Sequence, residues 1–444
     1  MTSSPAPSAS RSTLGIVFMI VFLDIAGFSI IFPLFPKLLE HYVAQEGADS
    51  AVGRLAEWLH GLAGRDENAV VTLFGGLLGS LYGLMQFVFS PIWGGWSDRV
   101  GRRHTLVVTM LGTALSYVAW TFAGSFALLV AARLLGGVMA GNISTAAAVA
   151  ADTTSGKDRA KGMGIVGMAI GLGFILGPAL GGISMAEPLR LDHALPGLQQ
   201  LGPFGLNPFS TPAVVALVLC LLNFVWMLRR LPETLPPERR GAHPGTLSVL
   251  RPFHRLKSLE YPGVARAHWI YFVQLLAFAA MEFTLTFLAA ERLDYGIGQI
   301  TWMFVFSGFV IAMVQGGGAH RMVKKRGERK VATLGMSIML PGYLVTGFAD
   351  STWMLYVGLF LLSAGSGFTM PAMSALVSRY VPADKQGLAQ GTLRSLGSLS
   401  RASGPVLGGL MYWKFGSAVP YWVGALMTLW PILACRTLPE IAEA

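Results

Sequence analysis

Residues 94–103 read Gly94-Gly95-Trp96-Ser97-Asp98-Arg99-Val100-Gly101-Arg102-Arg103, and long apolar stretches flank them on both sides. Four charged side chains therefore stand in a short turn between two segments that favour a nonpolar environment. A partial second copy, Lys324-Lys325-Arg326-Gly327-Glu328-Arg329-Lys330, follows in the other half of the chain, with Gly327 placed 226 residues after Gly101. The two copies indicate an internal duplication that keeps a charged loop at the same place in each half.

Composition predicts that the chain lies in a lipid bilayer. Of its 444 residues 53% are hydrophobic and only 13% are charged, and the mean hydropathy is +0.57, which excludes an ordinary water-soluble protein. The short alternating segments of a membrane β-barrel are absent, so we predict an all-α membrane protein with twelve transmembrane helices of about 20 apolar residues each. The predicted spans are 14–35, 71–95, 105–123, 127–150, 162–185, 212–229, 268–290, 300–319, 332–349, 352–378, 387–412 and 419–435.

The net charge of +10 is distributed unevenly between the loops. Twenty-four of the 33 Lys and Arg residues fall in the tails and loops on the side of the two termini, whereas six fall in the loops on the other side. Because basic loops stay in the cytoplasm, this asymmetry predicts cytoplasmic amino and carboxyl termini. Cys220 and Cys435 both fall inside predicted spans, so no disulfide framework is expected.

A glycine-rich hexapeptide marks the duplication a second time. Gly177-Pro178-Ala179-Leu180-Gly181-Gly182 recurs 227 residues later as Gly404-Pro405-Val406-Leu407-Gly408-Gly409. We therefore expect a tail at 1–13, a six-helix bundle at 14–230, a linker at 231–266, a second six-helix bundle at 267–437 and a tail at 438–444. Outside the spans we expect a linker helix near 247–259, a surface helix that carries Val52, Leu55, Leu59 and Leu62, and an irregular covering at 186–211.

Three motifs resemble those of the major facilitator superfamily of secondary transporters. The pattern G-x-x-x-D-R-x-G-R-R at 94–103 resembles the loop between the second and third helices of that family. The run 171–182 resembles a marker of its drug:proton antiporters, and 22–36, with Asp24, Pro33 and Pro36, resembles the first span of tetracycline-exporter-like proteins. The segments 73–80, 136–137 and 141–144 also resemble a branch whose animal relatives are linked to organic-anion efflux. The resemblance covers essentially the whole chain and implies a transporter, not an enzyme.

The charged loop is interpreted as a conformational latch. The resemblance implies that Asp98 accepts hydrogen bonds from the start of the eleventh helix, near residues 383–388, and so closes the cytoplasmic side. Pairing of Arg102 and Arg103 with Asp152 or Asp158 is a further expectation, and simple anchoring of the loop by its charges is the alternative. The predicted latch residues are Gly94, Asp98, Arg99, Gly101, Arg102, Arg103 and Asp152.

The fifth predicted span carries a motif for helix bending and close packing. Glycines four residues apart give a helix a face on which another backbone can pack closely, and Pro178 frees a carbonyl group and permits a bend. A plain packing face without a bend is the alternative. The predicted motif residues are Gly173, Gly177, Pro178, Gly181 and Gly182.

Five acidic or Arg residues fall inside predicted spans and away from the span ends, where a charge is costly and usually functional. Asp24 is our first candidate for carrying a proton, because the bilayer interior disfavours a charged carboxylate; Glu282 is the second, and Arg133 is expected to assist. The alternatives are a fixed salt bridge or a helix–helix hydrogen bond for each acid, and snorkelling to the interface for Arg133. For the two arginines of the eleventh span the alternative is pairing with these acids or with helix ends. The predicted substrate-binding residues are Asp24, Phe28, Arg133, Glu282, Arg394 and Arg401.

No phosphate-binding loop, metal-ligand spacing or Ser/His/Asp arrangement occurs in the sequence, so we predict no cofactor, no metal and no ATP-driven transport. The predicted function is a proton-coupled antiporter of a bacterial inner membrane that exports amphipathic small organic molecules. Its expected partners are that substrate, protons and the lipid bilayer, with no nucleic acid and no second subunit. A proton-independent uniporter or lipid flippase of the same fold and a non-transporting receptor or scaffold remain as alternatives.

Overall fold

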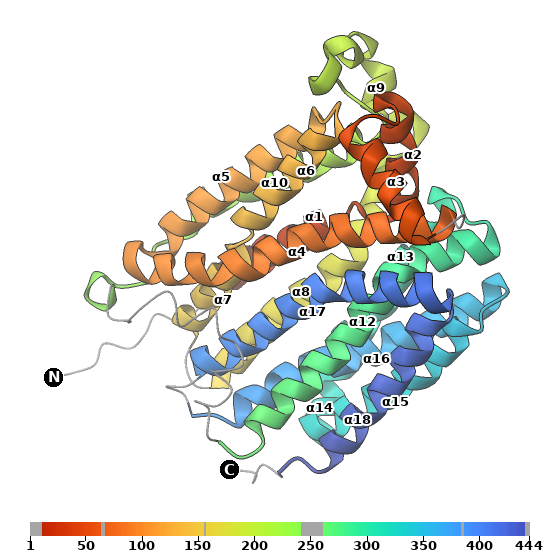
Figure 1. Ribbon diagram of the computed structural model, residues 1–444. Coiled ribbons are helices and arrows are strands. Elements are labelled where there is room, and N and C mark those ends of the chain that lie inside the picture. The colour runs from red at the N-terminus through yellow and green to blue at the C-terminus, as the bar shows by residue number, and fades with distance from the viewer. Residues whose placement is uncertain (1–10, 64–66, 155–156, 241–260, 383–385, 440–444) are drawn as a thin grey trace.

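The structure, a computed structural model, describes residues 11–63, 67–154, 157–240, 261–382 and 386–439. All regular elements in these ranges are helical. Eight spans among the described residues are long and apolar enough to cross a membrane, and α5, α15, α17 and α18 run alongside them (Figure 1). The prediction of an all-α membrane protein with twelve transmembrane helices in two six-helix bundles is confirmed.

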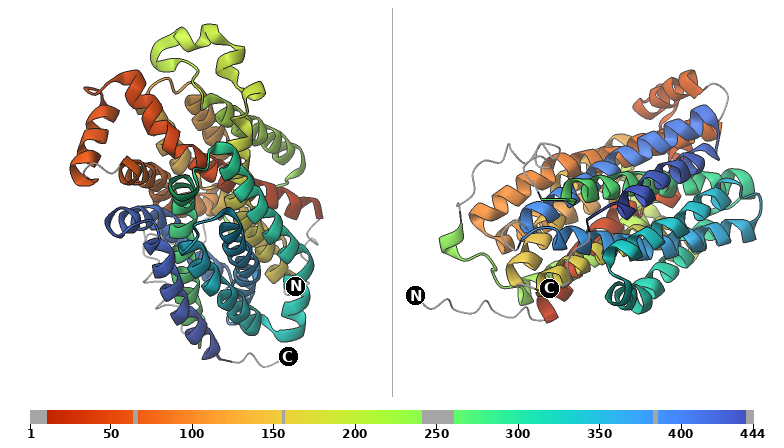
Figure 2. Two further views of the ribbon diagram at one scale, coloured as in Figure 1. Left: turned by 90° about the vertical axis from the view of Figure 1, so that its right-hand side faces the viewer. Right: turned by 90° about the horizontal axis from the view of Figure 1, so that it is seen from below.

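The first bundle consists of α1 (Arg11–Ser29), α4 (Glu67–Val100), α5 (Arg102–Thr121), the pair α6 (Phe126–Met139) and α7 (Asn142–Thr153), α8 (Lys157–Ser184) and α10 (Ser210–Arg230). The second consists of α12 (Val264–Leu293), α13 (Ile297–Met313) with the π-helix η6 (Val314–Ala319) and α14 (His320–Arg326), α15 (Glu328–Gly347), α16 (Thr352–Arg379), α17 (Gln386–Phe415) and α18 (Val419–Arg436). Figure 2 shows the helices of both bundles from two further directions.

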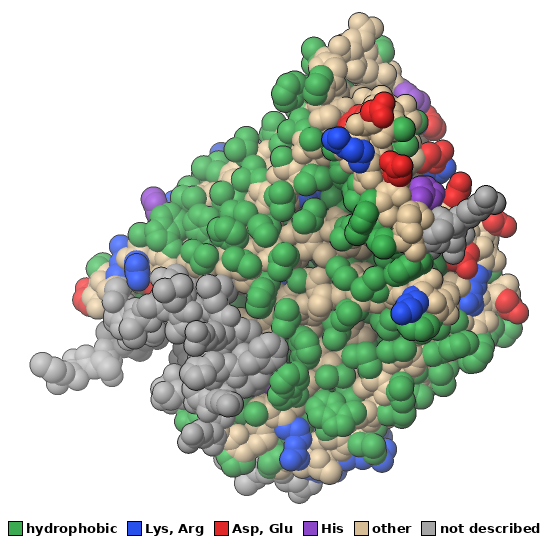
Figure 3. Space-filling model, viewed as in Figure 1, with side chains coloured by type: hydrophobic (Ala, Val, Ile, Leu, Met, Phe, Trp, Pro, Cys, Tyr) green, Lys and Arg blue, Asp and Glu red, His purple; other side chains and the backbone are tan. Residues whose placement is uncertain are grey.

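The end of α18, η4 (Pro237–Arg239) and the start of α12 lie on one side of the molecule (Figure 1). We call this the linker side and the opposite side the distal side. Hydrophobic side chains cover the flank of the bundles, while charged side chains gather toward the two ends, as Figure 3 shows for one face. This distribution fits helices that cross a bilayer. The linker helix expected near 247–259 falls outside the described residues.

A row of glycines lets α8 pack directly on the backbone of α1. A Cβ atom at Gly173 would lie 2.7 Å from the carbonyl oxygen of Phe22, and one at Gly181 would lie 2.0 Å from that of Ile30. At Gly177 the nearest atoms are the hydroxyl of Ser29 and the carbonyl of Ala26. The Ser29 hydroxyl donates a hydrogen bond to the Gly173 carbonyl at 3.2 Å. We call Gly173, Gly177 and Gly181 the first glycine seam.

The duplicated motif builds the same contact in the second bundle. Gly404 and Gly408 of α17 face α12, where a Cβ atom at Gly408 would lie 2.7 Å from the carbonyl oxygen of Ala280. These two residues form the second glycine seam. Gly182 and Gly409, which follow the seams, point to the opposite bundle instead: Gly182 faces Thr301 and Gly409 faces Thr72. The repeated motif therefore packs each bundle internally and also brings the two bundles together.

The two bundles meet on the distal side at a cluster of phenylalanines. Phe32 of η1 (Phe32–Leu34) and Phe35 of α2 (Phe35–Glu46) lie with their ring centroids 6.3 and 5.9 Å from that of Phe283. Phe287 continues the cluster at 5.2 Å from Phe283. All four side chains are at most 4% exposed. We call Phe32, Phe35, Phe283 and Phe287 the aromatic plug, and it fills the space between the two bundles on the distal side.

The distal surface is covered by short helices. The predicted surface helix is confirmed as α3 (Ala51–Ala63), in which Val52 and Leu59 are buried but Leu62 is exposed. The irregular covering predicted at 186–211 is wrong in part, because it folds into the helical turns η2 (Glu187–Leu189), α9 (Leu191–Ala194) and η3 (Pro196–Phe204). An ion pair lies within this covering. Although burial opposes ionisation of Asp192, the hydrogen bond and charge of Arg190 hold the pKa of Asp192 below its ordinary value.

The close packing at the first glycine seam predicts that adding a single methyl group there lowers the stability of the protein. Gly181→Ala places a Cβ atom against the Ile30 carbonyl, which belongs to the backbone and cannot rotate away, so the change should cost about 1–3 kcal/mol of stability. Thermal unfolding of the purified protein should show a lower Tm. Gly197→Ala is the control, because no atom lies within 4 Å of its added Cβ. Equal Tm values for the two variants would contradict the close packing of α1 and α8.

Candidate functional site

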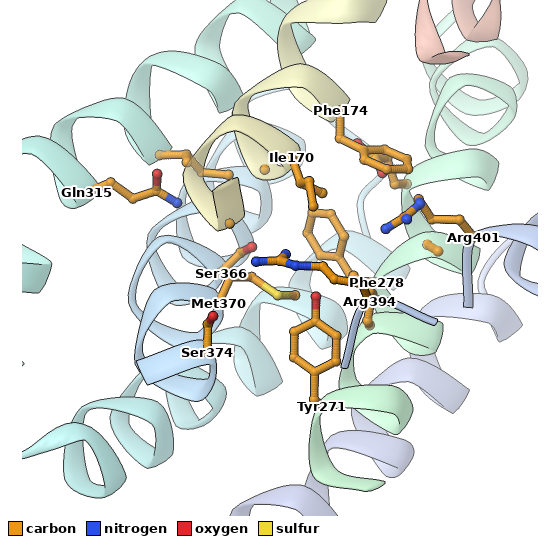
Figure 4. A pocket seen from close by; sticks show the side chains of 16 residues that line it. Ile170, Phe174, Tyr271, Phe278, Gln315, Ser366, Met370, Ser374, Arg394 and Arg401 are labelled. Atoms are coloured by element: carbon orange, nitrogen blue, oxygen red, sulfur yellow. The ribbon is translucent and has the colours of Figure 1, made fainter. Parts of the chain in front are cut away.

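A pocket lies on the linker side of the aromatic plug, and its empty space is about 620 Å³ with the open solvent at its mouth included. Residues of α8 line it from the first bundle, and residues of α12, α13, η6, α16 and α17 line it from the second (Figure 4). Apolar side chains such as Ile170, Phe174, Phe278 and Met370 make up much of its wall. A few polar and charged groups stand among them, which is the usual construction of a site for a small organic molecule.

Glu282 is the carboxyl group of the cavity. Its side chain is 3% exposed, and neither of its carboxylate oxygens has a hydrogen-bond partner among the described residues. Arg401 is close enough to act on it electrostatically. A buried carboxylate without donors is costly, so this group is stable when it holds a proton or when a ligand supplies the missing contacts.

Two arginines of α17 face the same cavity. Arg394 and Arg401 are seven residues apart, which puts them on one helix face, and in Figure 4 the guanidinium of Arg394 lies beside the hydroxyl group of Tyr271. Arg401 is 2% exposed; it donates to the Ser398 hydroxyl at 3.0 Å, and its guanidinium carbon lies 5.8 Å from the centre of the Phe174 ring. The cavity thus combines two cationic groups and one carboxyl group with aromatic walls.

Asp24 lies in the interior of the first bundle and is not part of the cavity wall. Its side chain is 4% exposed, and one carboxylate oxygen accepts a hydrogen bond from the Asn142 amide at 3.1 Å. The second oxygen has no hydrogen-bond partner among the described residues. Phe28, one turn further along α1, packs against the cavity wall, with its ring 5.6 Å from that of Phe174. Arg401 acts electrostatically on Asp24 as well as on Glu282.

Arg133 is buried beside α1 and does not snorkel to the interface. It donates to the backbone carbonyls of Gly27 and Phe28 at 3.3 and 2.9 Å, and its side chain is 3% exposed. Its guanidinium carbon lies 4.7 Å from the centre of the Tyr82 ring. Within the described part of the chain no carboxylate forms an ion pair with it. Arg133 therefore fixes the end of α1, and it is not among the residues that line the cavity.

The charged loop at 94–103 forms a compact ion-pair cluster on the linker side. Arg102 bridges Asp98 at 2.5 Å and Asp152 at 2.9 Å, so the predicted pair between Arg102 and Asp152 is present. Arg103 bonds to the Leu228 carbonyl instead, and Arg99 is exposed. The partner expected for Asp98 is the segment near residues 383–388, of which 383–385 lie outside the described ranges. The side chain of Asp158, the other expected partner of the arginines, is not described either.

Two backbone features of the loop follow from its glycines. Gly101 has a φ of 109°, which strongly favours glycine, and a Cβ atom there would lie 2.4 Å from a carboxylate oxygen of Glu233. Glu233 accepts hydrogen bonds from the backbone N–H groups of Arg102 and Arg103, at the positive end of α5. The end of the first bundle is thereby tied to the latch loop, a contact that the sequence did not indicate to us. At Gly94 an added Cβ atom would only be in ordinary contact with Ser144, 3.8 Å from its hydroxyl oxygen.

Sequence reasoning missed two further polar residues. Asn142 bonds to Asp24 because the predicted span 127–150 divides at Ala140 and Gly141, where the Trp93 side chain packs against Gly141. Gln315 lines the cavity from the π-helix η6, which follows α13 where the predicted span 300–319 continues. The dipeptide 141–142 and the glycine run 316–318 are the signals that indicate these irregular turns.

Comparison with known proteins identifies the family. The profile described as Major Facilitator Superfamily matches residues 16–326 and 270–441. Major facilitator superfamily domain-containing protein 10 of Mus musculus is 32% identical over 99% of this chain and 95% of its own length. Tetracycline resistance protein, class C, of Escherichia coli is 27% identical over 97% of each chain.

A solved structure agrees with the sequence matches. The crystal structure of the human organic anion transporter MFSD10 (TETRAN) superposes with a TM-score of 0.78 at 29% identity, covering 98% of this chain and 100% of that one. The helices are therefore arranged as in a known carrier, and the chain is not an enzyme. This multi-pass membrane protein belongs to the major facilitator superfamily of small-molecule transporters, in its tetracycline-exporter-like branch.

Proposed function

We propose that the protein is a proton-coupled antiporter that exports amphipathic organic molecules, with a preference for those that carry a negative charge. The observation that carries this proposal is the cavity, in which Arg394 and Arg401 stand near the carboxyl group of Glu282 among aromatic side chains. The guanidinium groups suit a carboxylate or sulfonate, and the apolar wall suits the rest of the molecule. The similarity to an organic anion transporter and to tetracycline resistance proteins supports both parts.

Two carboxyl groups are our candidates for proton coupling. Asp24 and Glu282 each have at least one carboxylate oxygen without a hydrogen-bond partner among the described residues. The positive charge of Arg401 acts electrostatically on both. A substrate that supplies hydrogen-bond donors to ionised Glu282 competes with a proton for this carboxyl group, whose oxygens have no partner among the described residues. Coupling then follows, because substrate and proton alter each other's binding to the same conformation. Arg133 supports Asp24 indirectly by holding the end of α1.

The switch between conformations uses contacts at both ends of the helices. The aromatic plug closes the distal side, and the cluster of Asp98, Arg102 and Asp152 stands where the linker side closes. We place the linker side in the cytoplasm, because the basic residues are concentrated there. The cavity in this conformation is then positioned for loading from the cytoplasm, as an exporter requires. A monomer in a bacterial inner membrane is the simplest setting.

The acids provide the first test. Asp24→Asn keeps the size of the side chain and can still bond to Asn142 but cannot release a proton, so proton-driven transport should fall to the level of protein-free liposomes while substrate binding persists. Glu282→Gln tests the second candidate in the same way. Uptake driven by a pH gradient and substrate binding should be measured for both. If both variants retain gradient-driven transport, neither acid carries the coupled proton.

The arginines provide the second test. Arg394→Gln removes one charged donor from the cavity, and because such a hydrogen bond contributes about 1.5–3 kcal/mol, the Kd of an anionic substrate should rise by roughly tenfold or more. An uncharged analogue of the same substrate should bind as before. Lys414→Gln is the control, since Lys414 is an exposed base at the distal end of the same helix. Equal weakening of the anion and the uncharged analogue would contradict recognition of charge by Arg394.

A further inference from the structure

A second cavity lies on the flank of the molecule, away from the substrate cavity. It runs between α4 and α17, which lie side by side in Figure 1, and the end of α3 overhangs it. Leu73 and Leu77 line it from α4, and Leu410 and Trp413 line it from α17. We call it the lateral groove. It joins the two bundles at the level of the aromatic plug.

The walls of the lateral groove are suited to hydrocarbon. Every residue that lines it is apolar or a glycine, and the tryptophan N–H groups are the only polar side-chain atoms among them. Leu77 is 39% exposed and Leu410 is 41% exposed. The flank on which they lie is largely hydrophobic (Figure 3). The groove therefore opens into the bilayer and not into water, so the molecules that reach it are those of the membrane.

The dimensions of the groove match one lipid leaflet. Pro405 and Trp413 line it eight residues apart on α17, which corresponds to about 12 Å along the helix. One leaflet of hydrocarbon is about 15 Å deep, half of the bilayer core. Trp58 and Leu62 of α3 are 56% and 46% exposed and reach over the groove from the distal surface. Their position is that of side chains that cover an acyl chain near the membrane interface.

We infer that the lateral groove binds one acyl chain of a phospholipid from the distal leaflet. The chain lies along α17 between Pro405 and Trp413, with Trp58 and Leu62 over it. Gly409 forms the floor: an added Cβ atom there would lie 3.4 Å from Thr72 and 3.7 Å from Phe283 of the plug. A bound chain thus contacts both bundles directly behind the plug, and it stabilises the conformation that is closed on the distal side.

A lipid with bromine on its acyl chain tests the inference, because bromine quenches tryptophan fluorescence at contact. The full-length protein in detergent micelles is titrated with brominated phosphatidylcholine, and the contribution of Trp58 is obtained by subtracting the signal of Trp58→Phe. We expect quenching that saturates at about one lipid per protein, as a single site requires. Quenching that rises in proportion to the lipid fraction without saturation would overturn the proposal.

Two variants connect the signal to the groove. Gly409→Leu fills the floor and should abolish saturable quenching, whereas Gly298→Leu adds the same side chain at an open position of α13 and should leave it unchanged. Leu62→Ser alters an exposed residue without disturbing the fold and should weaken binding roughly tenfold, the effect of losing one apolar contact. Equal quenching in Gly409→Leu and Gly298→Leu, or unchanged affinity in Leu62→Ser, would overturn the proposal.

Discussion

Backbone contact between glycine-rich helices is the constraint on which the remainder of the structure depends. In a bilayer the hydrophobic effect does not drive helices together, so close packing across small residues has to hold them. Gly173, Gly177 and Gly181 bring α8 against α1, and Gly404 and Gly408 bring α17 against α12. Across the boundary between the bundles α8 packs on α13 and α16, and α17 packs on α4. Three of the seam helices, α8, α12 and α17, contribute to the wall of the cavity.

The buried charges are divided between the two bundles. Asp24 and Arg133 belong to the first, and Glu282, Arg394 and Arg401 belong to the second. Arg401 is the residue whose charge reaches the acids of both bundles. A buried charge inside the bilayer costs free energy, so such residues are kept mainly where they have a function. In a carrier, a bound proton or a bound ligand can offset the charge. In the proposed mechanism, this shared guanidinium connects the cavity with the acid of the first bundle.

Sequence patterns predicted the spans well because an apolar run of sufficient length has one stable solution in a bilayer. The predicted spans 162–185 and 352–378 correspond to α8 and α16 with small differences at their ends. The helix α4 continues beyond its apolar run to Val100, since a helix also persists in the polar interface. The division between α6 and α7 was missed, because it depends on a side chain, Trp93, that packs in from α4.

The site was predicted less completely than the fold. Asp24, Glu282, Arg394 and Arg401 were singled out because charges are rare in spans, but the rotation of each helix decides which of them face the cavity. Asp24 faces the interior of its own bundle, whereas the other three line the cavity. The plug phenylalanines resemble any other apolar residues in the sequence. Only the packing of η1 and α2 against α12 reveals their role.

Proton coupling is tested most directly by simultaneous measurement of both fluxes. The purified protein is reconstituted in liposomes with an acidic lumen and a pH-sensitive dye inside, and an amphipathic organic anion is added outside. We expect substrate uptake accompanied by release of protons from the lumen, and loss of accumulation when the pH gradient is abolished. Uptake that proceeds without a change of internal pH, and that is indifferent to the gradient, would contradict antiport and favour a uniporter or flippase of the same fold.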